Sequence, residues 1–413
     1  MSQVTRSAPL HRLSLLSLIG GAASGVGMFV LNIVVARSTS PSGFADFAFF
    51  LALSQVWFIL TVAGLELAAP RLLARHPAEQ HGEAVGSILA LASVLALVAC
   101  LVAAIAADPL AGLTKSSRAL VVMAAAFGIA TGWRAIGERM TAAVGRVGAV
   151  AAVKSVEASI IVTGALAAAL LVGGPSWSVF AGLVVVAAFL AVGAYLALVR
   201  HRTGPWRTTA HTRRQLVSFA RYAAPTTVFA VAIVYIDKFA MRIGGTDLQY
   251  AQYSAYFSGS VLLAAQAVFV LQSVVLPATV RAASGAQVRH QIFRLLPLLA
   301  VGLPVLYMCS GWTVLKVLGP NYHYLLAEGV LFACWATLYT INILGMTACV
   351  GRSSRAMRRE SLVLVARVLL AAGALGGLIA ADRISITSVV LVMVTLELCE
   401  TANVVTMMRR YLV

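Results

Sequence analysis

The sequence has few acidic residues, few cysteines and no long polar segment. Its 413 residues include 14 aspartates and glutamates, and charged residues of both signs make up only 11% of the chain. Soluble proteins contain about 25% charged residues, so an ordinary soluble domain is excluded. The cysteines lie in or at the edge of apolar stretches without paired spacing, which indicates small buried side chains and neither disulfides nor metal ligands. They are Cys100, Cys309, Cys334, Cys349 and Cys399.

Motifs for nucleotide, cofactor and metal chemistry are also missing. There is no P-loop, no glycine-rich dinucleotide fingerprint and no HExxH sequence. The seven histidines fall in polar loops, and none forms a metal-binding pair at helical spacing. An Asp-x-Asp pair, which could hold a sugar nucleotide with a metal, is absent as well. We therefore expect no cofactor, no metal, no catalytic residues and no enzymatic activity.

Apolar stretches of membrane-spanning length account for nearly the whole chain, of which 61% is hydrophobic. Each can cross about 30 Å of hydrocarbon as a helix, which satisfies its own backbone hydrogen bonds. The sequence predicts an all-α, polytopic integral membrane protein with about 12 transmembrane helices. The expected spans are 13–36, 44–68, 84–107, 118–137, 147–172, 177–199, 217–240, 250–277, 292–312, 325–349, 361–381 and 385–407.

The net charge of +17 has a topological explanation. In a soluble protein it would suggest a nucleic-acid partner. Here most of the 31 lysines and arginines fall in alternate loops, on the side that also holds both termini. The positive-inside rule then predicts an inner-membrane protein with both termini cytoplasmic. The basic loops favour contact with anionic membrane lipids, and no nucleic acid is expected.

The chain divides into two halves of six spans each. The longest polar interruption, RHRTGPWRTTAHTRRQ at 200–215, separates an N-terminal bundle (1–199) and a C-terminal bundle (217–413), with 200–216 as a cytoplasmic linker. ARSTSPSGFADFAFF at 36–50 is echoed by MRIGGTDLQYAQYSAYF at 241–257. Such a parallel repeat predicts two six-helix bundles around a central cavity, with the substrate site between them.

Ionisable residues inside the spans are candidates for function, because each costs about 2.5–3.5 kcal/mol at a helix centre. Lys154 and Glu157 stand on one face of the span at 147–172, where they either pair with each other or serve an anionic ligand and a coupling ion. Glu157 and Asp237 are the candidates for ion coupling. Arg367 and Glu400 lie at similar separations from the turn near Arg383, which favours a structural ion pair over an independent substrate site.

Charged residues also gather at the outer ends of the first helix in each half. Arg37 and Asp46 flank the first outer turn, and Lys238, Arg242 and Asp247 lie around its counterpart. They form either ordinary salt bridges at loop ends or a cationic rim for a phosphate-bearing headgroup, for which arginine offers bidentate contacts. Asn32, Gln55 and Asn342 are uncharged polar groups inside spans, which could bind sugar hydroxyls or bond across helices.

Several stretches resemble the Wzx-type polysaccharide flippases of the multidrug/oligosaccharidyl-lipid/polysaccharide exporter superfamily. They are VVARSTSPSGFADFAFFLAL at 34–53, VAGLELAAPRLLAR at 62–75, YIDKFAMRIGGTDLQYAQYSAYF at 235–257, VLPATVRAA at 275–283 and LKVLGPNYHY at 315–324.

The resemblance implies two bundles enclosing a central, often cationic cavity. It further implies flipping of undecaprenyl-pyrophosphate-linked oligosaccharide from the cytoplasmic to the periplasmic leaflet by alternating access, for lipopolysaccharide or exopolysaccharide biosynthesis. Binding residues carry over to Arg37, Lys238 and Arg242 by motif position and to Lys154 by charge. A polysaccharide polymerase and other assembly proteins are candidate partners.

Two alternatives stay open. One is a cation-coupled multidrug exporter of the same superfamily, whose cavity should be acidic and aromatic, in contrast to the basic residues singled out here. The other belongs to a different class, a membrane glycan polymerase or ligase. That enzyme would need a large outer loop with catalytic residues, and the outer loops of this sequence are short.

Overall fold

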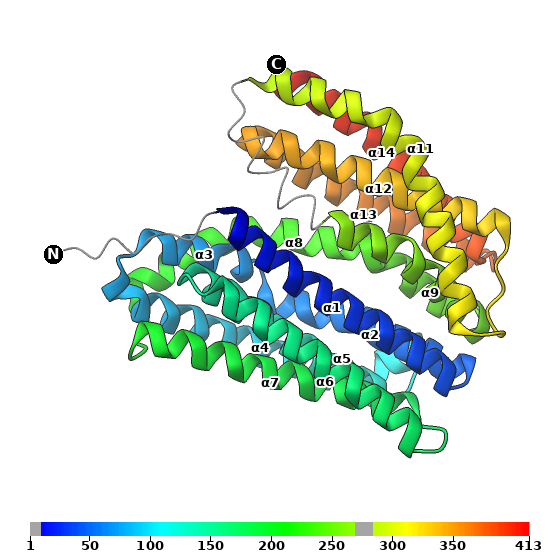
Figure 1. Cartoon of the computed structure of the whole chain (residues 1–413), viewed down its shortest axis with the longest axis horizontal. Coiled ribbons are helices and arrows are strands. Elements are labelled where there is room, and N and C mark those ends of the chain that lie inside the picture. The colour runs from blue at the N-terminus through cyan, green and yellow to red at the C-terminus, as the bar shows by residue number, and fades with distance from the viewer. Residues whose placement is uncertain (1–9, 269–283, 413) are drawn as a thin grey trace.

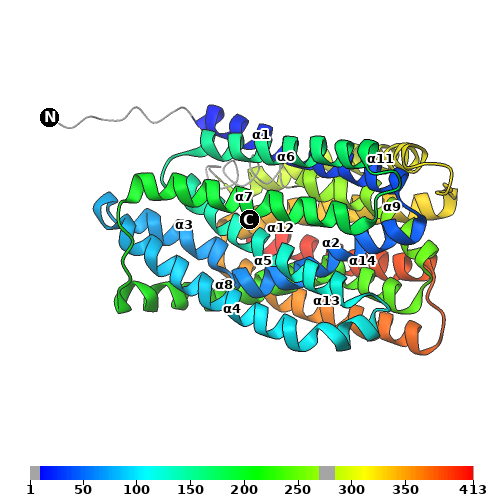
Figure 2. The same ribbon diagram turned by 90° about the horizontal axis from the view of Figure 1, so that it is seen from below.

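A computed structural model describes residues 10–268 and 284–412, which are almost entirely helical and contain no strand (Figure 1). Figure 2 shows that most of the long helices run along a common axis. The helices are α1 (Leu10–Ser38), α2 (Pro41–Val62), α3 (Leu65–Arg75), η1 (Ala78–Gln80), α4 (His81–Leu113), α5 (Arg118–Ala143), α6 (Val147–Leu171), α7 (Trp177–Thr203), α8 (Ala210–Gly244), α9 (Asp247–Gly259), α11 (Gly285–Leu318), α12 (Leu326–Arg352), α13 (Ser354–Ala380) and α14 (Ile386–Tyr411).

The helices match the predicted membrane architecture. In the described part of the chain ten helices are long and apolar enough to cross a membrane, and α8, which bends by 41°, makes an eleventh. The predicted span at 250–277 begins with α9 and continues as helix through 261–268, and its remainder lies outside the described residues. The all-α class with about 12 helices is confirmed.

We call the end of the molecule at which α1 finishes and α2 begins the outer end; it lies at the right of Figure 1. Most helices that start there follow a serine or threonine. Ser40 accepts a hydrogen bond from the backbone N–H of Gly43, and Thr246 accepts one from that of Gln249. Such N-caps satisfy backbone donors that a helix start leaves free, so they fix where the outer turns end.

The second helix of each half is broken. The predicted span at 44–68 divides into α2 and α3 at Ala63 and Gly64, which have φ of 38° and 81°. A Cβ on Gly64 would lie 2.7 Å from the backbone nitrogen of Ala224, so α3 and α8 approach too closely here for a larger residue. In the second half, α9 breaks at Ser260 before helix resumes at 261. The shared break agrees with the repeat seen in the sequence.

The two halves meet at the outer end through aromatic side chains. Phe44 of α2 packs edge-on against Tyr322, which follows α11, with ring centroids 5.6 Å apart. Phe49 of α2 packs against Phe239 of α8 and Tyr250 of α9, at 5.5 and 6.0 Å. Phe239 is half-buried and the other rings are buried, so these contacts join α2 of the first half to α8, α9 and α11 of the second.

At the opposite end, α8 itself connects the halves. Residues 204–209 link α7 to α8, and the first turns of α8 bury Leu216 and Ala220 in one apolar cluster with residues of α3 and α4. Thr227 of α8 also donates a hydrogen bond of 2.8 Å to Glu66 of α3. Much of the predicted linker at 200–216 is therefore helical.

Candidate functional site

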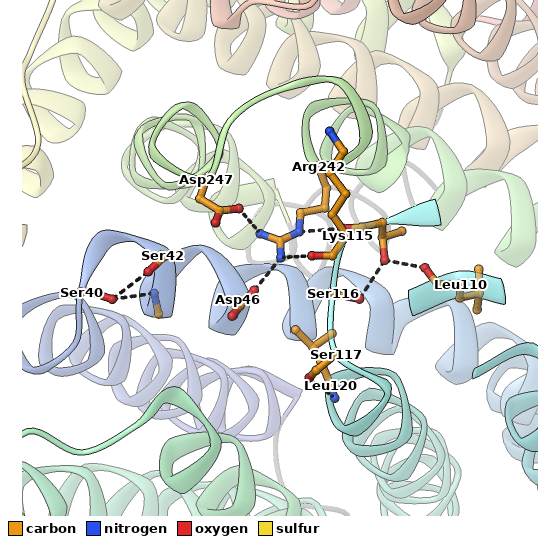
Figure 3. A network of polar contacts seen from close by, with 12 residues as sticks. Ser40, Ser42, Asp46, Leu110, Lys115, Ser116, Ser117, Leu120, Arg242 and Asp247 are labelled. Carbon is orange, nitrogen blue, oxygen red and sulfur yellow. Dashed lines mark hydrogen bonds and ion pairs between the residues drawn. The ribbon is translucent and has the colours of Figure 1, made fainter. Parts of the chain in front are cut away.

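Arg242, in the last turn of α8, is the centre of a polar network at the outer end (Figure 3). Its side chain is 4% exposed and lies between two carboxylates, with Nη2 2.6 Å from Asp46 and Nη1 2.9 Å from Asp247. Nε donates to the carbonyl oxygen of Thr114 at 3.1 Å, and Nη2 to that of Lys115 at 3.4 Å. All three guanidinium nitrogens of Arg242 therefore have protein partners, as a buried arginine requires.

Arg37 and Arg242 make reciprocal contacts between the halves. Arg242, at the end of the first helix in the second half, binds carbonyl groups that follow α4 of the first half. Arg37, at the end of the first helix in the first half, donates through Nε to the carbonyl oxygen of Val317 in the last turn of α11, at 2.6 Å. Because α4 and α11 are the third spans of their halves, each arginine binds the equivalent helix end of the other half, where carbonyls lack helical partners.

Lys238 and Asp237 lie one turn deeper on α8 and are enclosed by aromatic rings. Tyr253 of α9 donates its hydroxyl hydrogen to Asp237. Lys238 Nζ lies 2.9 Å from the centroid of the Phe257 ring and 4.9 Å from that of Tyr235, and it donates no hydrogen bond. Cation–π contacts thus replace hydrogen bonds at a lysine that is 5% exposed.

Two ion pairs connect α5 with α6. Lys154 Nζ is 2.7 Å from Glu138, and Arg134 donates to Glu157, which is 4% exposed. Lys154 and Glu157 therefore pair with α5 and not with each other. Sequence reasoning singled out neither Glu138 nor Arg134; their four-residue spacing, which places them on one face of a helix, was the available signal.

The polar residues inside spans have different partners. Asn32 donates to the carbonyl oxygen of Met28 in its own helix at 2.9 Å, and Gln55 is half-buried on α2. Asn342 of α12 donates to the carboxylate of Glu397 on α14 at 2.7 Å and to its backbone oxygen at 2.9 Å. Only Asn342 thus bonds across helices, among these three.

A cavity of about 340 Å³ lies inside the second half, between α8, α12, α13 and α14. Its charged lining consists of Arg367 and three glutamates. Arg367 Nη2 is 2.6 Å from Glu397, whereas Nη1 is 3.7 Å from Glu400. Glu360, also in the lining, was missed by sequence reasoning because it lies just before the predicted span; it stands two turns from Arg367 on the same helix face.

The cavity differs in character from the basic site expected from the sequence. Trp335 and Tyr339 line it together with the three glutamates, so it is acidic and aromatic. Arg37, Lys154, Lys238 and Arg242 each contact other groups, and none of the four lines this cavity. In residues 10–268 and 284–412, no group of three or more His, Cys, Asp or Glu side chains could hold a metal ion.

Comparison with known proteins agrees with this architecture. Residues 12–283 match the family model described as "Polysaccharide biosynthesis protein". No curated protein sequence matches the chain. Among solved structures, it is similar to an inward-facing multidrug resistance MATE family transporter of the MOP superfamily, with a TM-score of 0.74, 9% identity and coverage of 97% of this chain and 98% of that one.

Two further solved structures share the fold. The outward-facing conformation of a MATE family transporter of the MOP superfamily has a TM-score of 0.64 at 10% identity, covering 98% of this chain and 95% of its own. A MOP superfamily transporter from Pyrococcus furiosus has a TM-score of 0.65 at 12% identity with the same coverage. That transporter is described as having a binding pocket of reversed polarity. The chain shares the fold of these transporters, and it belongs to the polysaccharide biosynthesis protein family.

Proposed function

We propose that the chain flips an undecaprenyl-pyrophosphate-linked oligosaccharide from the cytoplasmic to the periplasmic leaflet of a bacterial inner membrane. The observation that carries this proposal is the match to a polysaccharide biosynthesis family over 12–283 in a chain with a transporter fold. A pyrophosphate cannot enter hydrocarbon without losing its hydration, so its passage needs fixed donors in a wet cavity while the polyprenyl tail stays in lipid.

The contacts at the outer end support alternating access. Arg37 and Arg242 tie the halves together there, beside the rings of Phe44, Phe49 and Tyr322. Separating the halves at this end would break these contacts, which is the change required for release toward the periplasm. The inward-facing neighbour also has a higher TM-score than the outward-facing one.

The same separation would supply donors for the substrate. In the present arrangement Arg242 donates its hydrogen bonds to Asp46, Asp247 and two backbone carbonyls. Once Asp46 and the α4–α5 turn move away, Nε and Nη2 become available to pyrophosphate oxygens, which accept charge-assisted bonds from arginine. Arg37, Lys154 and Lys238 are the other basic residues that we assign to this role.

Deletion of the gene followed by glycan analysis tests the proposal. The expected result is loss of surface polysaccharide, with lipid-linked repeat units accumulating in the cytoplasmic leaflet. Expression of the intact chain should restore the surface polysaccharide. Accumulation in the periplasmic leaflet would contradict flipping and favour a polymerase or ligase.

A cation-coupled multidrug exporter is the second candidate. The acidic, aromatic cavity in the second half favours it, because carboxylates and aromatic faces attract amphipathic cations. Intact glycan with increased sensitivity to cationic drugs after deletion would select this function over the first.

A further inference from the structure

The carboxylates of the second-half cavity differ in how many of their oxygens have a hydrogen-bond or ion-pair partner. Glu397 is fully engaged, since one oxygen contacts Arg367 at 2.6 Å and the other accepts from Asn342 at 2.7 Å. Among the residues that the structure describes, Glu400 accepts a bond of 3.2 Å from Asn403 through Oε1, but its Oε2 accepts none. Oε2 of Glu360 also accepts none, although Glu360 is 5% exposed and Glu400 3%.

Glu360 and Glu400, the two cavity carboxylates whose Oε2 accepts no hydrogen bond, face each other. Glu360 of α13 and Glu400 of α14 are close enough for a side-chain hydrogen bond. Two ionised carboxylates are both acceptors and repel, so a hydrogen bond between them requires that one carries a proton. Arg367 is the one arginine that lines the cavity among the described residues, and it cannot neutralise the pair because its nearer partner is Glu397.

We propose that Glu360 and Glu400 form a proton-binding site, in which the two carboxyl groups share one proton that is exchanged through the cavity. The lining extends from Arg367 to Val350 and Met357, which flank the α12–α13 turn. That turn lies on the side that the sequence assigns to the cytoplasm, so protons would enter from there.

The surrounding groups favour a proton over a metal ion. Arg367 and Glu397 face the pair from α13 and α14, and Tyr339 and Cys349 lie near it on α12. Arg359 contacts the pair indirectly, because it donates a hydrogen bond to Asn403, which in turn donates to Glu400. The described residues of α8 that line the cavity are the apolar Ala230, Ile233 and Val234. A guanidinium beside the carboxylates repels a metal cation but tolerates a shared proton.

Infrared difference spectroscopy of the purified full-length chain in lipid nanodiscs tests the site without any substrate. Between acid and alkaline conditions, the wild type should lose a C=O stretching band of a protonated carboxyl group. Glu360→Gln and Glu400→Gln should each remove that band. Glu138→Gln is the control, because Glu138 is paired with Lys154 and should leave the band unchanged.

Three results would overturn the site: no such band in the wild type, an undiminished band in both glutamine variants, or loss of the band when sodium chloride is added at constant pH. The last would identify a sodium site instead. Should Glu360→Gln not accumulate, Glu400→Gln and Glu360→Asp decide the question, since the aspartate variant should keep a band at a shifted frequency.

A coupling role for this proton rests on the proposed function. In proteoliposomes, an imposed proton gradient should accelerate flipping of a fluorescent polyprenyl-pyrophosphate glycan by the wild type and have no effect on Glu360→Gln. Equal acceleration of both proteins would contradict coupling. Absence of flipping by the wild type under every gradient would instead contradict the proposed function, and the infrared band would still decide whether the proton site exists.

Discussion

Arg242 of α8 and Asp46 of α2 form an ion pair of 2.6 Å that joins the two halves at the outer end. The arginine is 4% exposed and the aspartate 30%, so the pair is shielded from solvent mainly on the arginine side. Asp247 and two backbone carbonyls are further acceptors of Arg242. The arginine therefore connects α2, α8, α9 and the α4–α5 turn.

We predict that Arg242→Ala destabilises the outer contacts. Removing one partner from a largely buried ion pair costs about 3–5 kcal/mol, because the remaining charges lose their compensation. The measurable result is a lower Tm in detergent and faster labelling of a cysteine placed at Thr114, which is 1% exposed. Arg118→Ala is the matched control, since its ion pair with Asp108 is about two-thirds exposed at 3.6 Å and should matter little. Equal Tm values for the two variants would contradict this role.

Arg242→Lys separates charge from geometry. A lysine can keep one ion pair but cannot reach two carboxylates and the carbonyl of Thr114 together. If charge dominates, transport by Arg242→Lys should stay well above that by Arg242→Ala. If bidentate contacts to phosphate or protein are required, flipping assays should show nearly equal loss for both variants.

The reciprocal position of Arg37 leads to a further prediction. Arg37→Ala should lower Tm less than Arg242→Ala, because Arg37 is exposed and donates to the neutral carbonyl of Val317. Since both arginines connect the same two halves, their effects on the accessibility of cysteines at the outer end should not be additive in the double variant. Strict additivity of the cysteine-labelling rates would show that the two contacts act independently.

The helical architecture could be predicted from hydropathy, whereas the partners of the charged side chains could not. The spans follow from apolar length, and the repeat around Arg37 and Arg242 follows from an echo in the sequence. The break at Gly64 does not follow from hydropathy, and the close approach of α8 that excludes a larger residue there is a contact distant in sequence.

The rotation of each helix about its axis decides partners, and hydropathy does not report it. A pair with Glu157 was one of the two alternatives for Lys154, and Lys154 contacts Glu138 instead. For Arg367, depth in the membrane identified the right pair of helices, but Glu397 and Glu400 stand one turn apart, and the closer contact is to Glu397. Whether the residues assigned to substrate and ion coupling serve those roles stays a prediction.

The α5–α6 ion pairs can be tested by charge exchange. Lys154→Glu alone should reduce membrane abundance, because the new carboxylate would face Glu138 in the membrane. Combining it with Glu138→Lys should restore abundance. Combining it with Glu157→Lys should not, because that lysine would face Arg134. Recovery with the Glu157 exchange would show that Lys154 and Glu157 pair within α6.

Topology follows from the distribution of basic residues. We predict that cysteines at Ser116 and Ser176 label from the periplasm, and that a cysteine in 204–209 labels only after the cytoplasmic side is exposed. A membrane-impermeant maleimide applied to intact and permeabilised cells measures this. Labelling of Ser116 and Ser176 exclusively from the cytoplasm would reverse the orientation and with it the proposed direction of transport.

The last prediction concerns Arg367, for which two partners are within reach. Arg367→Glu should lower membrane abundance, because it places a fourth carboxylate beside Glu397, Glu400 and Glu360. The exchange with Glu397→Arg should restore abundance more fully than the exchange with Glu400→Arg, since Glu397 lies 2.6 Å from the guanidinium and Glu400 3.7 Å. Immunoblotting of membranes measures abundance, and the flipping assay is run on the same samples. Normal abundance of the single variant with no flipping would instead place Arg367 in the translocation site, because its charge would then serve the substrate and not the fold.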